Sequence, residues 1–466
     1  MNEQENQENM ALIGKSIDDL KNMVRKGTSP YHVVAEAAEQ LRAAGFKELP
    51  WVEMGGQEWE LKKGGAYFVA PFRTSLMAFR IDEGFNAGQS LRMVSAHVDS
   101  PGLRIKAKAE YPYKSYQRVN TEVYGGAINH TWMDRPLGMA GIVAIRQSGS
   151  LTPRIYYLDC QRPIFIIPNL SIHMNREINK GTEFNPQVDL IPVGGIGIDD
   201  LAKEAFFTNF LAEEINRAEA AGTKAVNDQP MAVQAGDIIS YDCGLYVIQE
   251  GLVCGMHQEM LAAPRLDNLT SVQAGLTALI DGHRSGGINL LALFDHEEIG
   301  SRSKSGGAGN ILPLTLERIY HALGYSRSDY LRAIAGGFLL SADTAHAVNP
   351  NHPEKYDPTT GIGLGEGVAI KCAAKQSYAG DAETWALLQN LADRDDIPCR
   401  LTYIRSDIPG GSTLGPILSS ALPMRSADIG VPMLAMHSAV ETIGCRDQYY
   451  LERFLKVFFT SEERLI

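Results

Sequence analysis

Short uninterrupted apolar runs recur along the chain and are separated by segments with helical periodicity. Residues 288–294 read INLLALF, as expected of a sheet strand that is covered on both faces. Apolar residues return at helical spacing in segments such as 269–282 and 449–459. Four further runs follow the plan of the first and end in polar or charged residues: 91–100, 336–343, 399–407 and 431–438. This alternation predicts an α/β fold in which a mostly parallel mixed sheet is flanked by helices.

The N-terminal region contains a polar tail and a helix. The first nine residues, MNEQENQEN, lack the apolar segment of a signal peptide, and we expect them to form a frayed tail. Ser29 is a suitable N-cap, and Pro30 suits the first position of a helix that continues toward Phe46.

The segment 101–235 differs from the rest because it is rich in turns and β-prone stretches. A long amphipathic helix is predicted near its end, over residues 199–222. A connection between two strands of the main sheet does not require so many residues, so we predict that 101–235 is an inserted β-rich domain involved in assembly. The main domain then consists of residues 1–100 and 236–466.

Ionisable side chains stand where the predicted strands end. The apolar runs lead to His97, to Glu297 with Glu298, to Asp343 and to His437. In open α/β sheets, ligands bind at the carboxyl ends of the strands. We therefore expect these side chains to meet at one edge of the sheet.

Each of these residues also has a purely structural interpretation. In the sequence HVD, His97 and Asp99 share one face of an extended strand, so the carboxylate can support the imidazole, although a lone H-x-D is a weak signal. Asp267 could cap the helix that follows it, or its two oxygens could bridge two metal ions. Glu297 and Glu298 could form a solvated acidic turn, or one could ligate a cation while the other accepts a proton from water.

Composition excludes several functions. The chain has 466 residues and a net charge of −12, which leaves no basic surface for nucleic acid and disfavours binding to anionic membranes. Six scattered cysteines form no CxxC pair, which is typical of a reduced protein, and we predict a cytoplasmic location. HExxH, GxSxG and P-loop motifs are absent from the sequence. Two histidines with three carboxylates instead favour a pair of divalent ions such as Zn²⁺, Mn²⁺ or Co²⁺.

Two glycine-rich segments remain. GIGLGEG at 361–367 follows no predicted strand and is interpreted as a flexible loop. GGSTLGP at 410–416 follows a strand predicted to end at Asp407, and we expect it to line the same cleft as the ionisable residues.

With these residues identified, the chain resembles the M18 aminopeptidases, a family of the zinc-peptidase fold type that includes the aspartyl aminopeptidases. The motifs that carry the resemblance occur in order: SAHVDSPGLRIK, EVYGGAINHTWMDRPLGMAG, IPNLSIHMNREIN, RLDNLTS, DHEEIGS, SADTAHAVNPNHPEK and MHSAVETIG. The resemblance implies a dinuclear zinc site with five ligands: His97, Asp267 as the bridge, Glu298, Asp343 and His437. It also implies Glu297 as general base and Asp99 as support for His97.

The resemblance further implies a dimerisation role for the inserted domain, a tetrahedral dodecamer and binding of peptide substrates. His173 would reach the active site of a neighbouring subunit, Lys371 would lie near the first side chain of the substrate, and His346 is a further candidate for substrate binding. Eukaryotic members carry histidines at the positions of Asn349 and Asn169, so both an acidic and a broader, neutral preference stay open.

The activity expected on this basis is release of single residues from the free N-terminus of peptides. Two alternatives stay open. The same metal site suits a carboxypeptidase or an amide deacylase, which would cut N-blocked peptides. A non-enzymatic assembly scaffold would use the acids only to cap helices and would need no metal.

Overall fold

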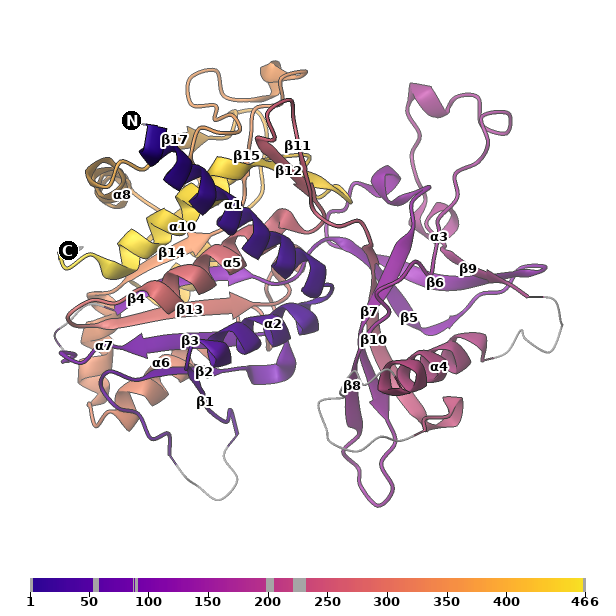
Figure 1. The fold of residues 1–466 in the computed structure, drawn as a ribbon, viewed down its shortest axis with the longest axis horizontal. Helices are drawn as coiled ribbons and strands as arrows, with labels where there is room; N and C mark the ends of the chain where they lie inside the picture. Colours follow the sequence, from indigo (N-terminus) through magenta and orange to yellow (C-terminus); the bar gives the residue numbers. More distant parts are fainter. Residues whose placement is uncertain are drawn as a thin grey trace.

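The structure is a computed structural model that describes residues 3–52, 58–86, 88, 91–197, 205–220 and 232–463. It contains three sheets, and Figure 1 shows two regions side by side. One region holds the largest sheet with its covering helices, and the other holds a separate sheet built from residues between β5 and β10.

The largest sheet has nine strands and a mixed topology. Its order is β1 (Lys47–Glu48), β2 (Ala66–Val69), β3 (Leu76–Ile81), β13 (Ile288–Phe294), β4 (Leu91–His97), β14 (Phe338–Ala342), β18 (Arg425–Gly430), β16 (Val368–Cys372) and β17 (Cys399–Tyr403). Five of the eight neighbouring pairs are parallel, which confirms the predicted mostly parallel mixed sheet.

The end predicted for β17 at Asp407 is wrong. The strand stops at Tyr403, opposite Cys372, because its parallel partner β16 ends there and offers no further backbone groups. Arg405 then pairs with Asp407 (2.7 Å) within an irregular segment.

Helices cover both faces of this sheet, as predicted. Packed on one face are α1 (Glu3–Lys26), α2 (Pro30–Ala43), α5 (Leu266–Asp281), α8 (Ala382–Arg394) and α10 (Cys445–Thr460). Packed on the other are α6 (Ile311–Ala322), α7 (Arg327–Ala335) and α9 (Leu414–Ala421). All seven residues of β13 are buried, and their side chains alternate between the two cores, with Leu291 and Leu293 in one and Leu290 and Ala292 in the other.

A smaller sheet of five strands adjoins the first. Its order is β11 (Leu252–Cys254), β12 (Met260–Ala263), β20 (Glu441–Gly444), β19 (Pro432–Leu434) and β15 (Ala345–His346). The apolar run 431–438 was expected in the main sheet, and this expectation is wrong. β18 ends at Gly430, and β19 pairs with β15 and β20 instead, so His437 approaches from a different sheet.

The third sheet is the six-stranded one of the second region. Its order is β8 (Arg154–Asp159), β7 (Leu137–Ile145), β10 (Ile238–Val247), β5 (Gly102–Glu110), β6 (Tyr116–Tyr124) and β9 (Val193–Ile196), accompanied by α3 (Pro186–Asp189) and α4 (Phe206–Ala220). β10 pairs with β5 and β7, so this sheet extends past the boundary predicted at residue 235. Of the helix predicted over 199–222, residues 206–220 are helical, whereas 199–204 and 221–222 lie outside the described residues.

The N-terminus forms a helix, so the prediction of a frayed tail is wrong. α1 begins at Glu3, and Ile17 and Leu20 farther along it are buried in the core that also contains α5 and α10. This packing stabilises the helix, so the polar residues that precede Ile17 are helical as well. Met1 and Asn2 lie outside the described residues. The helix start at Pro30 and the N-cap position of Ser29 are confirmed, although the Ser29 side chain contacts His32 Nδ1 and makes no capping hydrogen bond.

Several 3₁₀ helices complete the described fold: η1 (Pro71–Arg73), η2 (Asn129–Trp132), η3 (Ile178–Lys180), η5 (Ala235–Asp237), η6 (Glu297–Ile299) and η7 (Pro353–Lys355). All six cysteines lie in described segments and are free. Among the helices that the structure describes, none combines the length and hydrophobicity needed to span a bilayer.

Candidate metal site

The carboxyl ends of three neighbouring parallel strands bring four predicted site residues together. β4 lies between β13 and β14. His97 is the last residue of β4, and Asp343 follows β14 directly. Glu297 and Glu298 follow β13 on the short helix η6. The edge predicted from the strand ends therefore exists.

Two further predicted residues reach this edge from other elements. Asp267 lies in the first turn of α5, where Arg265 occupies the N-cap position. Asp267 itself has non-helical backbone angles, and among the described hydrogen bonds its carboxylate accepts none from the backbone of α5, so it makes no capping bond there. His437 lies in the loop between β19 and β20 of the five-stranded sheet.

Asp267 lies between the two histidines. Its Oδ1 is 3.3 Å from His97 Nε2, and its Oδ2 is 3.5 Å from His437 Nε2. Asp343 Oδ1 lies 3.4 Å from His97 Nε2, and Glu298 Oε2 lies 3.4 Å from His437 Nε2. Each imidazole therefore faces one oxygen of Asp267 and one further carboxylate.

The donors fit a divalent metal ion. Within each of three overlapping groups, ligand atoms lie within 4.8 Å of one another: His97 with Asp267 and Asp343, Asp267 with Glu298 and His437, and His97 with Glu297 and Glu298. Imidazole nitrogens with carboxylate oxygens suit Zn²⁺ and similar ions. Among the described residues, the buried Oδ1 of Asp267 accepts no hydrogen bond, which is costly for a carboxylate unless a cation satisfies it.

The two glutamates are held in an unfavourable environment. Burial, reinforced by the charges of Asp343 and Asp99, raises the pKa of Glu297 to about 8. Burial and the charge of Asp267 likewise raise the pKa of Glu298 well above its usual value. A divalent cation among these acids would offset the repulsion, which explains why adjacent glutamates follow so apolar a strand.

The pKa values of the two histidines are also raised, which favours their charged forms. Burial lowers the pKa of His437, but Asp267 and Glu298 outweigh it and raise that pKa to about 10. Burial also opposes the charge on His97, but the Asp267 and Asp343 carboxylates hold its pKa well above the usual value. Without a metal ion, each histidine therefore acts as the cation of the site.

These shifts predict how the metal-free protein responds to pH. Glu297 and Glu441 have pKa values raised from 4.5 to about 8, so the stability they contribute is present below pH 4.5 and lost as the pH rises to about 8. The stability from His437 is lost between about pH 6.5 and about pH 10. Asp267, whose pKa is lowered, loses its contribution only below about pH 3.8. The melting temperature of chelator-treated protein should therefore fall from pH 5 to pH 9.

The control for this prediction is the same series of melts with saturating Zn²⁺. Bound cations replace protons as the partners of the carboxylates, so the metal-loaded protein should lose much less stability over this range. Identical pH dependence with and without metal would show that these groups do not take up an ion.

Asp99 holds the backbone that carries the two glutamates and also contacts His97. It is fully buried, and its Oδ1 and Oδ2 accept hydrogen bonds from the backbone N–H groups of Glu297 (3.1 Å) and Glu298 (3.2 Å). His97 Nδ1 lies 2.9 Å from the backbone oxygen of Asp99 and 3.6 Å from Oδ1. A donor on Nδ1 leaves Nε2 free to ligate.

Glu441 performs a similar task on the other side and was not predicted. It is buried at the start of β20, and its Oε2 accepts a hydrogen bond from the N–H of Asp267 (3.0 Å). Its Oε1 accepts one from the N–H of His437 (2.7 Å). The only sequence signal was an acidic residue in the motif MHSAVETIG, four positions after His437.

A cavity of about 700 Å³ opens over these residues. His346, Lys371 and Asn349 line it together with the candidate ligands and Glu297. The segment 410–413 also lines it, as expected for GGSTLGP, and 361–367 forms a loop between strands. Lys371 is buried and donates hydrogen bonds to Asp343 Oδ2 (3.3 Å) and to the backbone oxygen of Thr344 (2.8 Å).

His173 is not brought to this cavity within one chain. It lies exposed in a turn between β8 and α3, and it is absent from the described lining of the cavity. Asn169 in the same segment donates from its side chain to Asp134 Oδ2 (2.7 Å).

Comparisons with known proteins agree with this geometry. A family model for aminopeptidase I zinc metalloproteases (M18) matches residues 23–459. A probable M18 family aminopeptidase 2 from Clostridium acetobutylicum is 39% identical over 441 residues, which cover 94% of this chain and 97% of the relative. A chain in the cryo-EM structure of the Ape4 and Nbr1 complex has a TM-score of 0.89 at 30% identity, covering 97% of this chain and 86% of that chain.

A further structure, that of the S. cerevisiae mApe1 dodecamer, has a TM-score of 0.78 at 25% identity and covers 95% of each chain. The family match spans both regions of the molecule and every residue of the candidate site. It confirms the predicted resemblance and the α/β fold, and it establishes a metal-dependent aminopeptidase. The chain belongs to the M18 family of aminopeptidase I zinc metalloproteases.

Proposed function

We propose that two divalent metal ions bind in the site and share Asp267. His97 and Asp343 would complete one set of ligands, and Glu298 and His437 the other. The observation that carries this proposal is that the two oxygens of Asp267 face two different histidines, at 3.3 and 3.5 Å. Bound ions, Zn²⁺ or else Mn²⁺ or Co²⁺, would polarise the scissile carbonyl and lower the pKa of a water molecule to about 7.

Glu297 is the general base in this proposal. Its carboxylate lies within reach of His97 and Glu298, and this proposal places it in neither ligand set. Its backbone N–H is fixed by Asp99, so the side chain starts from a defined position. Glu297 accepts a proton from the attacking water and donates it to the amine of the departing peptide.

The substrates are peptides with a free N-terminus, and we propose a preference for Asp or Glu as the first residue. A side pocket of about 210 Å³ adjoins the site and shares His346 and Lys371 with it. Lys355 and Arg405 also line this pocket, whereas its described lining contains no acidic side chain. Such a surface suits a carboxylate.

The test measures release of free amino acid from short peptides that differ only in their first residue, with Zn²⁺ or with chelator. Metal-dependent release that favours Asp or Glu over Leu is expected, together with no cleavage of the N-acetylated peptides. Preference for Leu would contradict the acidic specificity and keep the aminopeptidase. Cleavage of N-acetylated peptides would instead indicate a carboxypeptidase or deacylase.

Two lysine variants assign the preference. A hydrogen bond to a charged group contributes about 1.5 kcal/mol or more, which corresponds to about a factor of ten. Lys371→Met and Lys355→Met should therefore each lower kcat/KM for Asp peptides by about that factor and leave Leu peptides unchanged. Because Lys371 also contacts Asp343, zinc content must be measured for each variant. An equal loss of kcat/KM for the Asp and Leu peptides would show that the lysine does not bind the first side chain of the substrate.

We also propose that the protein is a homo-oligomer, a dodecamer built from dimers. The inserted domain would form the dimer contact, and His173 would enter the site of a neighbouring subunit. Support comes from the mApe1 dodecamer and from large apolar side chains exposed on the inserted domain: Leu170, Ile172, Met174, Val188 and Ile196. A monomer mass in light scattering would contradict this proposal.

A further inference from the structure

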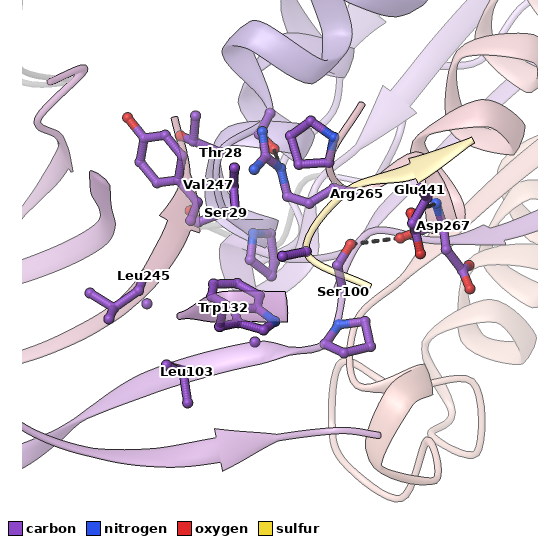
Figure 2. Close-up of a pocket in the computed structure, with 18 of the residues that line it drawn as sticks. Thr28, Ser29, Ser100, Leu103, Trp132, Leu245, Val247, Arg265, Asp267 and Glu441 are labelled. Carbon is purple, nitrogen blue, oxygen red and sulfur yellow. Dashed lines mark hydrogen bonds between the residues drawn. The ribbon is translucent and has the colours of Figure 1, made fainter. Parts of the chain in front are cut away.

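One stretch of the six-stranded region touches both ends of the metal site. The positioning segment, residues 124–131, runs from the last residue of β6 through two glycines into η2. Figure 2 shows a cavity that Trp132, the residue after this segment, lines together with Leu245 and Val247. Ser100 lies beside Asp267 in the same view and donates a hydrogen bond to its backbone oxygen (2.7 Å). Trp132 and Leu245 of the six-stranded region line this cavity together with Asp267, so the two regions meet beside a candidate ligand.

At one end of the segment, Tyr124 controls Asp99. The Tyr124 hydroxyl donates a hydrogen bond to Asp99 Oδ2 (2.7 Å). Burial and the charge of Asp99 raise the pKa of Tyr124, so the hydroxyl stays protonated and remains a donor. The Arg104 guanidinium lies over the tyrosine ring, 4.6 Å from its centroid, and limits its movement. Because Asp99 in turn orients His97 and η6, Tyr124 acts on both without contacting a ligand atom.

At the other end, the backbone of the segment holds His437. The Gly126 carbonyl lies 3.2 Å from His437 Nδ1 and accepts a hydrogen bond from it, which leaves Nε2 for a metal ion. The Ile128 N–H donates to the backbone oxygen of His437 (3.0 Å), and the Ala439 N–H donates to Thr131 Oγ1 (2.9 Å). Three hydrogen bonds thus tie the loop of His437 to the segment.

The two glycines make this approach possible. A Cβ on Gly126 would lie 3.2 Å from His437 Nδ1, and a Cβ on Gly125 would lie 3.2 Å from Glu298 Cβ. Gly125 also has a φ of 69°, which side-chain-bearing residues rarely adopt. The GG of the motif EVYGGAINH therefore serves close contact with two candidate ligands.

We propose that residues 124–131 of the inserted domain position the ligands of the metal site, so that this domain governs metal retention as well as assembly. The proposal rests on the metal site described under the proposed function. Partners that orient metal ligands affect metal affinity or activity by about 10–100-fold when they are removed. Tyr124 is a positioning residue in this scheme, since it acts through Asp99.

Tyr124→Phe tests the proposal, because it removes one hydrogen bond and keeps the ring. We expect zinc to pass to a chelating dye about ten times faster or more, and kcat to fall while KM is unchanged. The visible spectrum of the Co²⁺-substituted protein should also shift. Tyr116→Phe is the matched control, since Tyr116 is exposed at the opposite end of β6, and its zinc release and kcat should equal those of the wild type.

The outcomes separate this proposal from the proposed function. If Tyr124→Phe releases zinc and turns over like the wild type, the segment does not position the ligands, although the metal site stands. If the wild type keeps full activity after chelation, the metal site itself fails. Should Tyr124→Phe not fold, Gly126→Ala decides by the same zinc-release assay, since its added Cβ must displace His437.

Discussion

Replacement of Glu297 by glutamine is expected to lower kcat by about 10²- to 10⁴-fold, the contribution of a positioned general base. Glutamine keeps the shape of the side chain but cannot accept a proton. The bond between the Glu297 N–H and Asp99 uses the backbone and survives the substitution, so η6 should keep its position. KM and zinc content should therefore stay close to the wild-type values. Steady-state kinetics together with metal analysis measures all three quantities.

Glu298→Gln is the natural control for this variant. The two residues are adjacent on the same short helix, both are held by Asp99, and both carboxylates are largely buried. Glu298 Oε2 faces His437, and we propose it as a ligand, so its variant should lose metal as well as activity. Wild-type kcat in Glu297→Gln would assign the proton transfer to another group. Metal loss in Glu297→Gln would make Glu297 a ligand.

The part of the site that follows from parallel strands was predictable from sequence. His97, Asp343 and Glu297 each follow an apolar run, and the strands β4, β14 and β13 are neighbours in the sheet. Parallel neighbours present their carboxyl ends at one edge, so the pattern of strand ends implies the meeting of the side chains. No other information was needed for this half of the site.

The other half depends on tertiary contacts that leave little trace in sequence. His437 follows β19, a strand of the five-stranded sheet. Assigning this strand to the main sheet still identifies His437 as a site residue, but it gives the wrong direction from which the side chain approaches the site. Glu441 accepts a hydrogen bond from a backbone N–H group, and Tyr124 donates one to the Asp99 carboxylate. No fixed sequence spacing accompanies such contacts, so the sequence does not predict them. The sheet of the second region extends past residue 235 because β10 pairs with strands about 100 and about 140 residues earlier, and such distant pairing has no local sequence signal.

Replacement of Asp267 by asparagine should be about as damaging as loss of the general base, for a different reason. Asp267 is the carboxylate whose two oxygens face the two histidines, and asparagine offers one oxygen and a neutral NH₂ group. The NH₂ group would face an imidazole nitrogen and cannot ligate a cation. If two ions share this residue, one substitution weakens both sites, and zinc content should fall below one ion per chain.

The expected loss of kcat follows from the charge stabilisation that the ions supply. That stabilisation amounts to several kcal/mol, and each ~1.4 kcal/mol corresponds to a factor of ten, so kcat should fall by about 10³-fold. Asp281→Asn at the exposed end of the same helix is the matched control, because Asp281 pairs only with Lys456 in the described contacts. Retention of two zinc ions in Asp267→Asn would show that the ions do not share this carboxylate. Retention of one ion would mean that Asp267 serves a single site, with the other ion held by its own histidine and acidic partner.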